Sequence, residues 1–180
     1  MNSAVVTLVI GGARSGKSTY AEKLARTYQG GRCYIATAEP FDDEMKARIA
    51  RHRRDRADAF ATTIEQPLEL SDALLQIPAS TAVALIDCVT VWLGNLLFHR
   101  GIQSEPYAEV KTFLKVLREA PCDVIIVTNE TGQGIVPGDA ESRAFRDHAG
   151  WLNQDLAAIA DVVVWMVAGI PVVIKGELRV

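Results

Sequence analysis

The chain has few cysteines, almost no excess charge and no long apolar run, and each shortage argues against a class of protein. Its three cysteines, Cys33, Cys88 and Cys122, show neither CxxC spacing nor nearby histidine pairs, so a disulfide framework or a zinc site is not expected. A net charge of −3 supplies no broad positive field for nucleic acid. No apolar stretch reaches the roughly 18–20 residues that cross a bilayer, and no basic segment opens the chain as in a signal peptide. We therefore expect a soluble, cytoplasmic protein that neither binds nucleic acid nor enters a membrane.

The rest of the composition is that of one globular domain, expected to span residues 1–180. Hydrophobic residues make up 49 % and charged residues 23 % of the 180 positions, close to the averages of folded proteins. Short apolar segments predict strands at residues 5–10, 33–36, 83–86, 123–127, 162–167 and 172–175. Apolar residues at helical spacing predict helices at residues 17–28, 40–56, 89–98, 107–119 and 141–160. Strands that alternate with helices indicate a mostly parallel sheet covered on both faces, and the Ile170-Pro171 break predicts an antiparallel hairpin at one edge.

A glycine-rich segment joins the first predicted strand to the first predicted helix. Residues 11–18 read GGARSGKS and match the phosphate-loop pattern G-x-x-x-x-G-K-[ST]. The glycines allow backbone N–H groups to wrap around phosphate oxygens at the positive end of the helix. We expect Lys17 to reach the β and γ phosphates and Ser18 to bind Mg²⁺. The alternative, an ordinary glycine turn that matches by chance, is disfavoured by the flanking strand and helix.

A carboxylate at the end of a neighbouring strand should complete the magnesium site. Asp87 ends the strand at residues 83–86, whereas Asp123 begins its strand and so belongs to the opposite edge of the sheet. The alternative role for Asp87 is that of N-cap of the helix that follows, and the two roles are compatible. Asp87 is therefore the predicted second magnesium ligand.

A basic segment surrounds one histidine in the predicted helix at residues 40–56. Arg48, His52 and Arg56 are spaced i, i+4, i+8, so they project from one face. One interpretation is a solvated helix end whose charges suit the macrodipole. The other is an anion-binding face whose positive charge keeps His52 neutral and nucleophilic. His99 and His148 lack such a setting and are expected to be structural. The irregular segment at residues 129–140 is long enough to suggest a functional loop.

Segments spread along the whole chain resemble the bifunctional adenosylcobinamide kinase / adenosylcobinamide-phosphate guanylyltransferase family of cobalamin biosynthesis. They are GGARSGKS (11–18), YIATA (34–38), DDEMKARIARHR (42–53), NLL (95–97), TNETGQGIVP (128–137), FRDHAGWLNQDLA (145–157) and GIPVVIK (169–175). The phosphate loop is common to many enzymes, whereas its combination with RIxxHR and TNExGxGIVP is specific. This chain has Arg51 where some members of the family carry a second histidine. It has Phe60 near the position where relatives often carry tryptophan.

The resemblance implies a fold and two reactions. The fold is an α/β P-loop NTPase (RecA-like) three-layer sandwich with a mostly parallel sheet and an antiparallel edge hairpin. A nucleoside triphosphate, ATP or GTP, phosphorylates the aminopropanol hydroxyl of adenosylcobinamide. GMP then passes from GTP to that phosphate through a guanylylated histidine, which falls on His52, and pyrophosphate leaves. The resemblance also implies a homotrimer.

The site residues that the resemblance implies are catalytic, nucleotide-binding or metal-binding. The catalytic pair is His52 and Lys17, and Mg²⁺ falls on Ser18 and Asp87. The nucleotide contacts fall on Gly11, Gly12, Ala13, Arg14, Ser15, Gly16, Lys17, Ser18, Thr37, Ala38, Glu39, Arg53, Arg54, Asp55, Arg56, Glu65 and Asp87.

Two other classes of function remain open from the sequence. A small-molecule P-loop kinase without nucleotidyl transfer would use the arginines only to clamp its acceptor. A nucleotide-dependent switch protein would explain the phosphate loop but leaves the residues around His52 without a task. The helix at residues 40–56 is also the part we expect to move between the two reactions, because they attack different phosphorus atoms.

Overall fold

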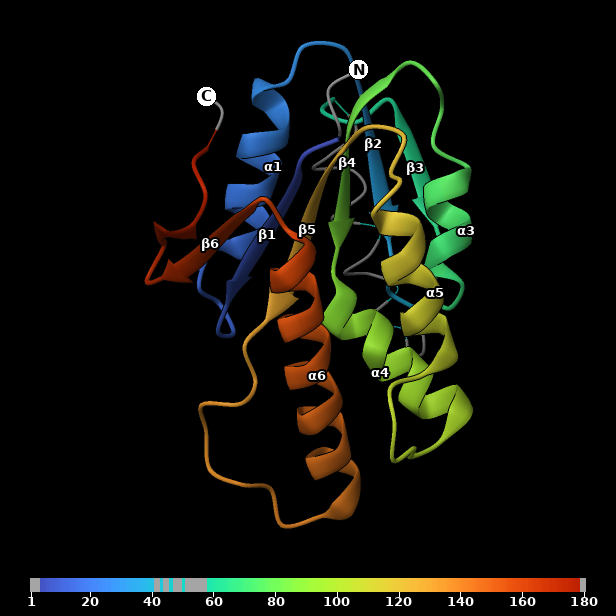
Figure 1. The fold of residues 1–180 in the computed structure, drawn as a ribbon, viewed down its shortest axis with the longest axis vertical. Helices are drawn as coiled ribbons and strands as arrows, with labels where there is room; N and C mark the ends of the chain where they lie inside the picture. The colour runs from blue at the N-terminus through green and yellow to red at the C-terminus, as the bar shows by residue number, and fades with distance from the viewer. Residues whose placement is uncertain (1–3, 41–42, 44–45, 47–49, 51–57, 179–180) are drawn as a thin grey trace.

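The computed structural model describes residues 4–40, 43, 46, 50 and 58–178 (Figure 1). Its strands are β1 (Val6–Gly11), β2 (Gly31–Ala36), β3 (Thr62–Glu65), β4 (Thr81–Asp87), β5 (Asp123–Asn129), β6 (Val162–Val167) and β7 (Ile170–Lys175). Its helices are α1 (Lys17–Thr27), α3 (Leu70–Leu75), α4 (Val89–Arg100), α5 (Ala108–Leu117) and α6 (Ala140–Ile159). Of the helix expected at residues 40–56, the described positions 43, 46 and 50 are helical and Pro40 is not; the other positions lie outside the described residues.

The strands form one seven-stranded sheet in the order β3-β2-β4-β5-β1-β6-β7. All neighbouring pairs are parallel except β6 and β7, which form an antiparallel hairpin. The mostly parallel sheet and its antiparallel edge are therefore confirmed. Because the parallel strands end at the same edge of the sheet, the loops that follow them are brought together there.

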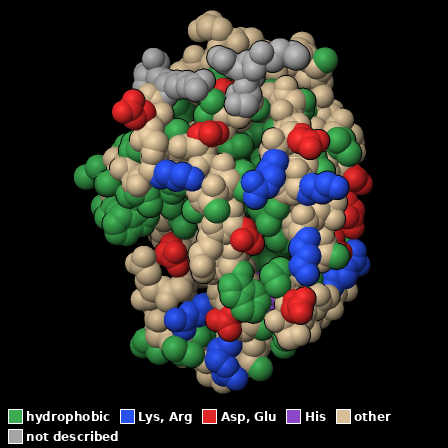
Figure 2. All heavy atoms as spheres, viewed as in Figure 1, with side chains coloured by type: hydrophobic (Ala, Val, Ile, Leu, Met, Phe, Trp, Pro, Cys, Tyr) green, Lys and Arg blue, Asp and Glu red, His purple; other side chains and the backbone are tan. Residues whose placement is uncertain are grey.

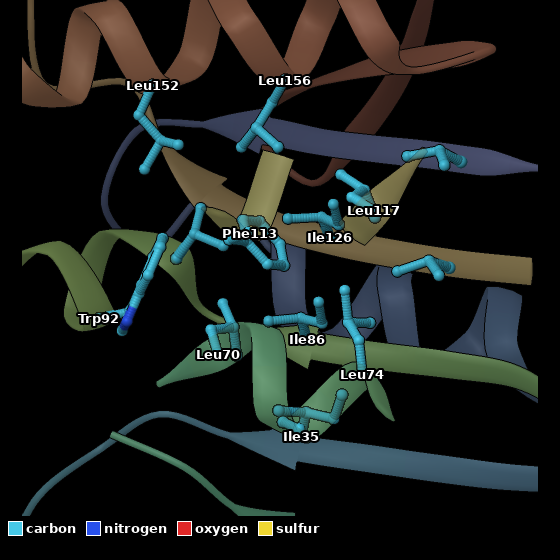
Figure 3. Packing of buried hydrophobic residues seen from close by; sticks show 14 of the residues in the cluster. Ile35, Leu70, Leu74, Ile86, Trp92, Phe113, Leu117, Ile126, Leu152 and Leu156 are labelled. Carbon is cyan, nitrogen blue, oxygen red and sulfur yellow. The ribbon is translucent and has the colours of Figure 1, made fainter. Parts of the chain in front are cut away.

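Alternate residues of the central strands point to opposite faces and build two separate cores. On one face, Ile86 and Ile126 of the sheet pack with residues of α3 to α6, including Trp92, Phe113 and Leu152 (Figure 3). On the other face, a smaller cluster packs the strands against α1. Helices therefore cover both faces, which confirms the expected three layers. In the described part of the chain, no helix is long and apolar enough to span a membrane.

Two elements and one turn differ from the sequence expectations. The sequence did not predict β3, which has a single large apolar residue, Ile64, and pairs only with β2. It also did not predict the six-residue helix α3. The break in the hairpin falls at Ala168 and Gly169, so Pro171 lies inside β7, paired with Met166. Proline is tolerated there because β7 is an edge strand with one neighbour.

The three cysteines are free thiols. Burial raises the pKa of Cys33, Cys88 and Cys122 to about 11. The thiols are therefore protonated at neutral pH and do not act as nucleophiles there. Phe60 packs its ring edge-on against Tyr34, with ring centroids 5.2 Å apart, so its role is in packing.

Candidate nucleotide-binding site

The phosphate loop lies between the end of β1 and the start of α1. Gly16 is the N-cap of α1 and has φ +90°, a left-handed backbone that favours glycine. Gly169 of the hairpin turn donates its N–H to the Ser15 carbonyl at 3.1 Å. A Cβ on Gly11 would lie 2.6 Å from the Met166 carbonyl oxygen. The loop is therefore packed directly against the β6–β7 hairpin, and glycine is required at both of its ends.

Lys17, the first residue of α1, lies over this loop and is almost fully buried. Its Nζ donates to the Gly12 carbonyl at 2.6 Å and lies 3.5 Å from Ser15 Oγ. Burial lowers the pKa of Lys17, and the nearby Cys88 and Asp87 partly offset that effect. The ammonium thus lies between the loop and the end of β4, where phosphate oxygens would meet it together with the N-terminus of α1.

Asp87 ends β4, as expected, on the same edge of the sheet. Its Oδ2 accepts a hydrogen bond from the Tyr34 hydroxyl of β2 at 3.0 Å. The N-cap of α4 is Cys88, whose Sγ accepts from Val91 N–H at 3.4 Å, so the alternative role of Asp87 as an N-cap is wrong. Asp123 begins β5 at the opposite edge, where it accepts from Val5 N–H at 2.8 Å. Asp87 thus lies near Lys17 at the edge of the sheet where the phosphate loop is.

Magnesium suits the oxygen atoms available here. Ser18 lies in the first turn of α1, and Asp87 lies near Lys17 at the end of β4. Hydroxyl and carboxylate oxygens are the hard ligands that Mg²⁺ takes, and it is usually held by one or two protein groups plus phosphates. Among the described residues, no group of three or more His, Cys, Asp or Glu could hold a metal ion by itself. The Ser18 hydroxyl and the Asp87 carboxylate are of the chemical type that fits Mg²⁺.

The segment after β2 is fixed by buried polar contacts. Thr37 is fully buried, and its hydroxyl donates to the Cys88 carbonyl at 2.8 Å and accepts from Cys88 N–H at 3.0 Å. Asn95 of α4 donates to the carbonyls of Thr37 at 2.7 Å and Pro67 at 3.0 Å. These bonds join the ends of β2 and β4 to α4. The supporting role of Asn95 is not predicted from the sequence. The feature that could have indicated it is an amide side chain among the apolar residues of this helix.

Glu39 and Glu65 lie at the same edge as the phosphate loop. Glu39 Oε2 is 2.9 Å from His99 Nε2 of α4, and Glu65 ends β3. His99 is therefore paired with Glu39, and His148 is buried with its Nε2 2.8 Å from the Gln103 carbonyl oxygen. The remaining predicted residues, His52, Arg53, Arg54, Asp55 and Arg56, lie outside the described residues.

A cavity of about 300 Å³ adjoins the phosphate loop on the side of the hairpin. Gly12 and Ser15 of the loop line it together with Glu130, Gln133 and residues 165–168. Glu130 follows β5 and is held in place because its N–H donates to the Gly11 carbonyl at 3.0 Å and its Oε1 accepts from Gly132 N–H at 2.7 Å. The loop at residues 130–139 therefore reaches the phosphate loop, a contact that its length alone did not predict.

Comparisons with known proteins agree with this geometry. Residues 7–174 match the family described as cobinamide kinase / cobinamide phosphate guanyltransferase. The bifunctional adenosylcobalamin biosynthesis protein CobP of Pseudomonas aeruginosa is 44 % identical over 170 residues, which cover 94 % of this chain and 97 % of that protein. The bifunctional adenosylcobalamin biosynthesis protein CobU of Escherichia coli is 40 % identical over 183 residues, which cover 95 % of this chain and 100 % of that protein.

Solved structures support the fold alone. The RadB recombinase superposes with a TM-score of 0.57 at 17 % identity, covering 99 % of this chain and 84 % of its own. A protein of Pyrococcus horikoshii superposes with a TM-score of 0.59 at 9 % identity, covering 99 % of this chain and 90 % of its own. These matches confirm the RecA-like fold. Sequence and structure agree from β1 to β7, and the chain belongs to the cobinamide kinase / cobinamide phosphate guanyltransferase family.

Proposed function

We propose that the chain is a bifunctional enzyme of adenosylcobalamin biosynthesis. It phosphorylates adenosylcobinamide from ATP or GTP, and it then transfers GMP from GTP to adenosylcobinamide phosphate. The observation that carries this proposal is the phosphate loop, which holds Lys17 beside Asp87 at one edge of the sheet in a chain of this family. Both substrates of the first reaction must meet at that edge, because the terminal phosphate binds there.

In the kinase reaction, the residues at this edge hold and orient the triphosphate. Backbone N–H groups of residues 11–18 and the N-terminus of α1 surround the β and γ phosphates, and Lys17 binds their oxygens. Mg²⁺ held by Ser18 and Asp87 would neutralise charge on the phosphates when bound. The acceptor hydroxyl oxygen attacks the γ phosphorus, the bond to the bridging oxygen breaks, and the hydroxyl proton passes to solvent. The nucleoside diphosphate leaves.

In the guanylyl reaction, His52 attacks the α phosphorus of GTP, and pyrophosphate leaves as a phosphorus–nitrogen bond forms. Arg53, Arg54 and Arg56 would bind the leaving pyrophosphate, since guanidinium groups pair well with phosphate. An oxygen of adenosylcobinamide phosphate then attacks the same phosphorus and releases His52. The other nucleotide contacts are proposed at Thr37, Ala38, Glu39, Asp55 and Glu65. Because Thr37 is buried with its hydroxyl engaged by Cys88, it supports the contacts made by its neighbours.

The proposed assembly is a homotrimer. Trp165, Val167, Ile170 and Val172 share one face of the β6–β7 hairpin and are 37 %, 41 %, 64 % and 43 % exposed. Figure 2 shows apolar side chains gathered over this hairpin. Contiguous exposed apolar surface of this kind usually marks an interface. The cavity beside the phosphate loop is too small to hold a corrinoid by itself, and a neighbouring copy bound at the hairpin would add a second wall to it.

The test is a pair of measurements on the intact protein and on His52→Ala. The protein is incubated with GTP and Mg²⁺, and intact mass with peptide mapping locates any GMP adduct. Adenosylcobinamide phosphorylation from ATP is assayed in parallel. We expect an adduct on His52, lost in His52→Ala while phosphorylation persists, and the control His99→Ala should keep the adduct. Phosphorylation without an adduct would leave a kinase alone, and nucleotide binding without either product would leave a switch protein.

A further inference from the structure

Buried polar side chains from two helices hold the end of β5. Asn129 N–H donates to Thr90 Oγ1 of α4 at 2.6 Å, and the Asn129 carbonyl accepts from Asn153 Nδ2 of α6 at 3.0 Å. Thr128 Oγ1 donates to Asn153 Oδ1 at 2.7 Å and lies 3.1 Å from Thr90 Oγ1. Thr90, Thr128 and Asn153 are 7 %, 1 % and 7 % exposed. Both backbone polar groups of Asn129 are thus fixed from the face of the sheet that α6 covers.

These hydrogen bonds fix the position of Asn129. Buried polar side chains are tolerated when they are hydrogen-bonded, and a satisfied network holds one arrangement of its members. The network also couples Asn129 to α4, whose N-cap follows directly after Asp87. On the other side, Glu130 N–H donates to the Gly11 carbonyl at 3.0 Å. The backbone of Asn129 is therefore held in register with both the phosphate loop and the end of β4.

The topology places the side chain of Asn129 beside the expected phosphates. β5 lies between β4 and β1, and Asn129 is the register partner of Gly11, where the phosphate loop begins. Along β5, Ile125 and Val127 pack on the face that α1 covers, whereas Thr128 points to α6. Because strand side chains alternate, Asn129 belongs to the α1 face. There it lies at the end of the sheet where α1 begins, and, within the described part of the chain, only the backbone of Asn129 and not its carboxamide makes hydrogen bonds.

We propose that the Asn129 carboxamide donates a hydrogen bond to the terminal phosphate of the bound nucleoside triphosphate, and that Thr90, Thr128 and Asn153 are positioning residues for it. A neutral amide suits this place, because it donates to an anion without competing with Asp87 for the metal. The carboxylate of Glu130 does not take this role, because an ionised carboxylate only accepts hydrogen bonds, as it does from Gly132 N–H, and repels phosphate. The inference rests on the proposed nucleotide site and adds a contact selective for the third phosphate.

The test compares affinity for GTP with affinity for GDP, with Mg²⁺, in the wild type, Asn129→Ala and Asn129→Asp. A hydrogen bond to a charged group predicts that GTP affinity falls roughly tenfold or more in Asn129→Ala, while GDP affinity changes far less. Asn129→Asp keeps the shape but repels phosphate, so its GTP affinity should fall further. The ratio of the two affinities is insensitive to a loss of folded protein, since that loss scales both alike. An unchanged ratio in both variants overturns the proposal.

The positioning residues are tested by Thr128→Val and its conservative partner Thr128→Ser. Thr128→Val removes the hydroxyl that joins Thr90 to Asn153, and it should lower the GTP to GDP affinity ratio. Thr128→Ser keeps that hydroxyl and should restore the ratio, whereas a merely structural role would lower melting temperature and leave the ratio alone. These measurements need no corrinoid. Absence of product from cobinamide would therefore refute the proposed function without touching the proposal on Asn129.

Discussion

Lys17 is the residue on which both proposed reactions depend, because each needs the triphosphate held in the same loop. Its Nζ donates to the Gly12 carbonyl at 2.6 Å, so its ammonium is oriented toward the loop. In Lys17→Ala we expect GTP affinity and both activities to fall by about 100-fold, since a buried ammonium makes charge-assisted hydrogen bonds to phosphate. Isothermal titration with GTP and the two product assays measure this effect.

The matched control is Lys23→Ala, on the exposed side of the same helix. It removes an equal charge without touching the loop, so its GTP affinity and its two activities should stay within about twofold of the wild type. If Lys17→Ala kept its guanylyl activity, the two reactions would not share one site. The buried position of Lys17 would then serve phosphoryl transfer alone.

Among the secondary-structure elements, those with strong periodicity were predictable from the sequence. The apolar runs within β1, β4 and β5 are buried on both faces, so their composition alone indicates central parallel strands. β3 could not be found that way, because an edge strand with residues TTIE needs only Ile64 to face the core. The sequence predicts the hairpin turn at the wrong residues because Pro171 suggests a break in the strand. An edge strand such as β7 tolerates a proline that a central strand would not.

Parts of the candidate site that consist of neighbouring residues in the sequence could be predicted. Parts that form only when distant residues come together in the fold could not. The phosphate loop is eight consecutive residues, and Asp87 ends an apolar run, so both could be identified directly. Tyr34 meets Asp87 across 53 positions, and Thr90 meets Thr128 across 38. A single sequence carries no signal for such pairs, because any buried threonine or tyrosine could find a partner elsewhere.

The helix α6 contains a glycine whose replacement should stabilise the protein. Gly150 lies in the interior of this 20-residue helix, and a Cβ built on it meets nothing within 4 Å. Alanine there reduces the freedom of the unfolded chain, so Gly150→Ala should raise the free energy of unfolding by about 0.5–1 kcal/mol. Urea denaturation measures the change.

A glycine of opposite character provides the control for that prediction. Gly176 has φ +71°, and a Cβ on it would collide with the Asp161 carbonyl. Gly176→Ala should therefore lower the free energy of unfolding by about 1 kcal/mol or more. A destabilised Gly150→Ala would mean that α6 packs against a surface beyond this one chain at that point.

At the scale of the whole molecule, the parallel sheet gathers the chemistry at one edge, and the hairpin extends that edge into a surface. The turn of the hairpin contacts the phosphate loop through the hydrogen bond from Gly169 N–H to the Ser15 carbonyl. A molecule that binds the hairpin can therefore affect the position of the loop. The antiparallel strand β7 is exposed along its whole length, although Ile170, Val172, Val173 and Ile174 are apolar. An edge strand of this composition invites pairing or packing with another chain.

If the hairpin is the interface of the proposed homotrimer, one charge on it should separate the subunits. Ile170→Asp places a carboxylate on the face shared by Trp165 and Val167, and burying it against another copy would cost several kcal/mol. We expect sedimentation to show monomers where the wild type shows trimers. Leu75→Asp is the control, because Leu75 is 74 % exposed on α3, away from the hairpin. A trimer that survives Ile170→Asp but not Leu75→Asp would move the interface to the α3 edge of the sheet.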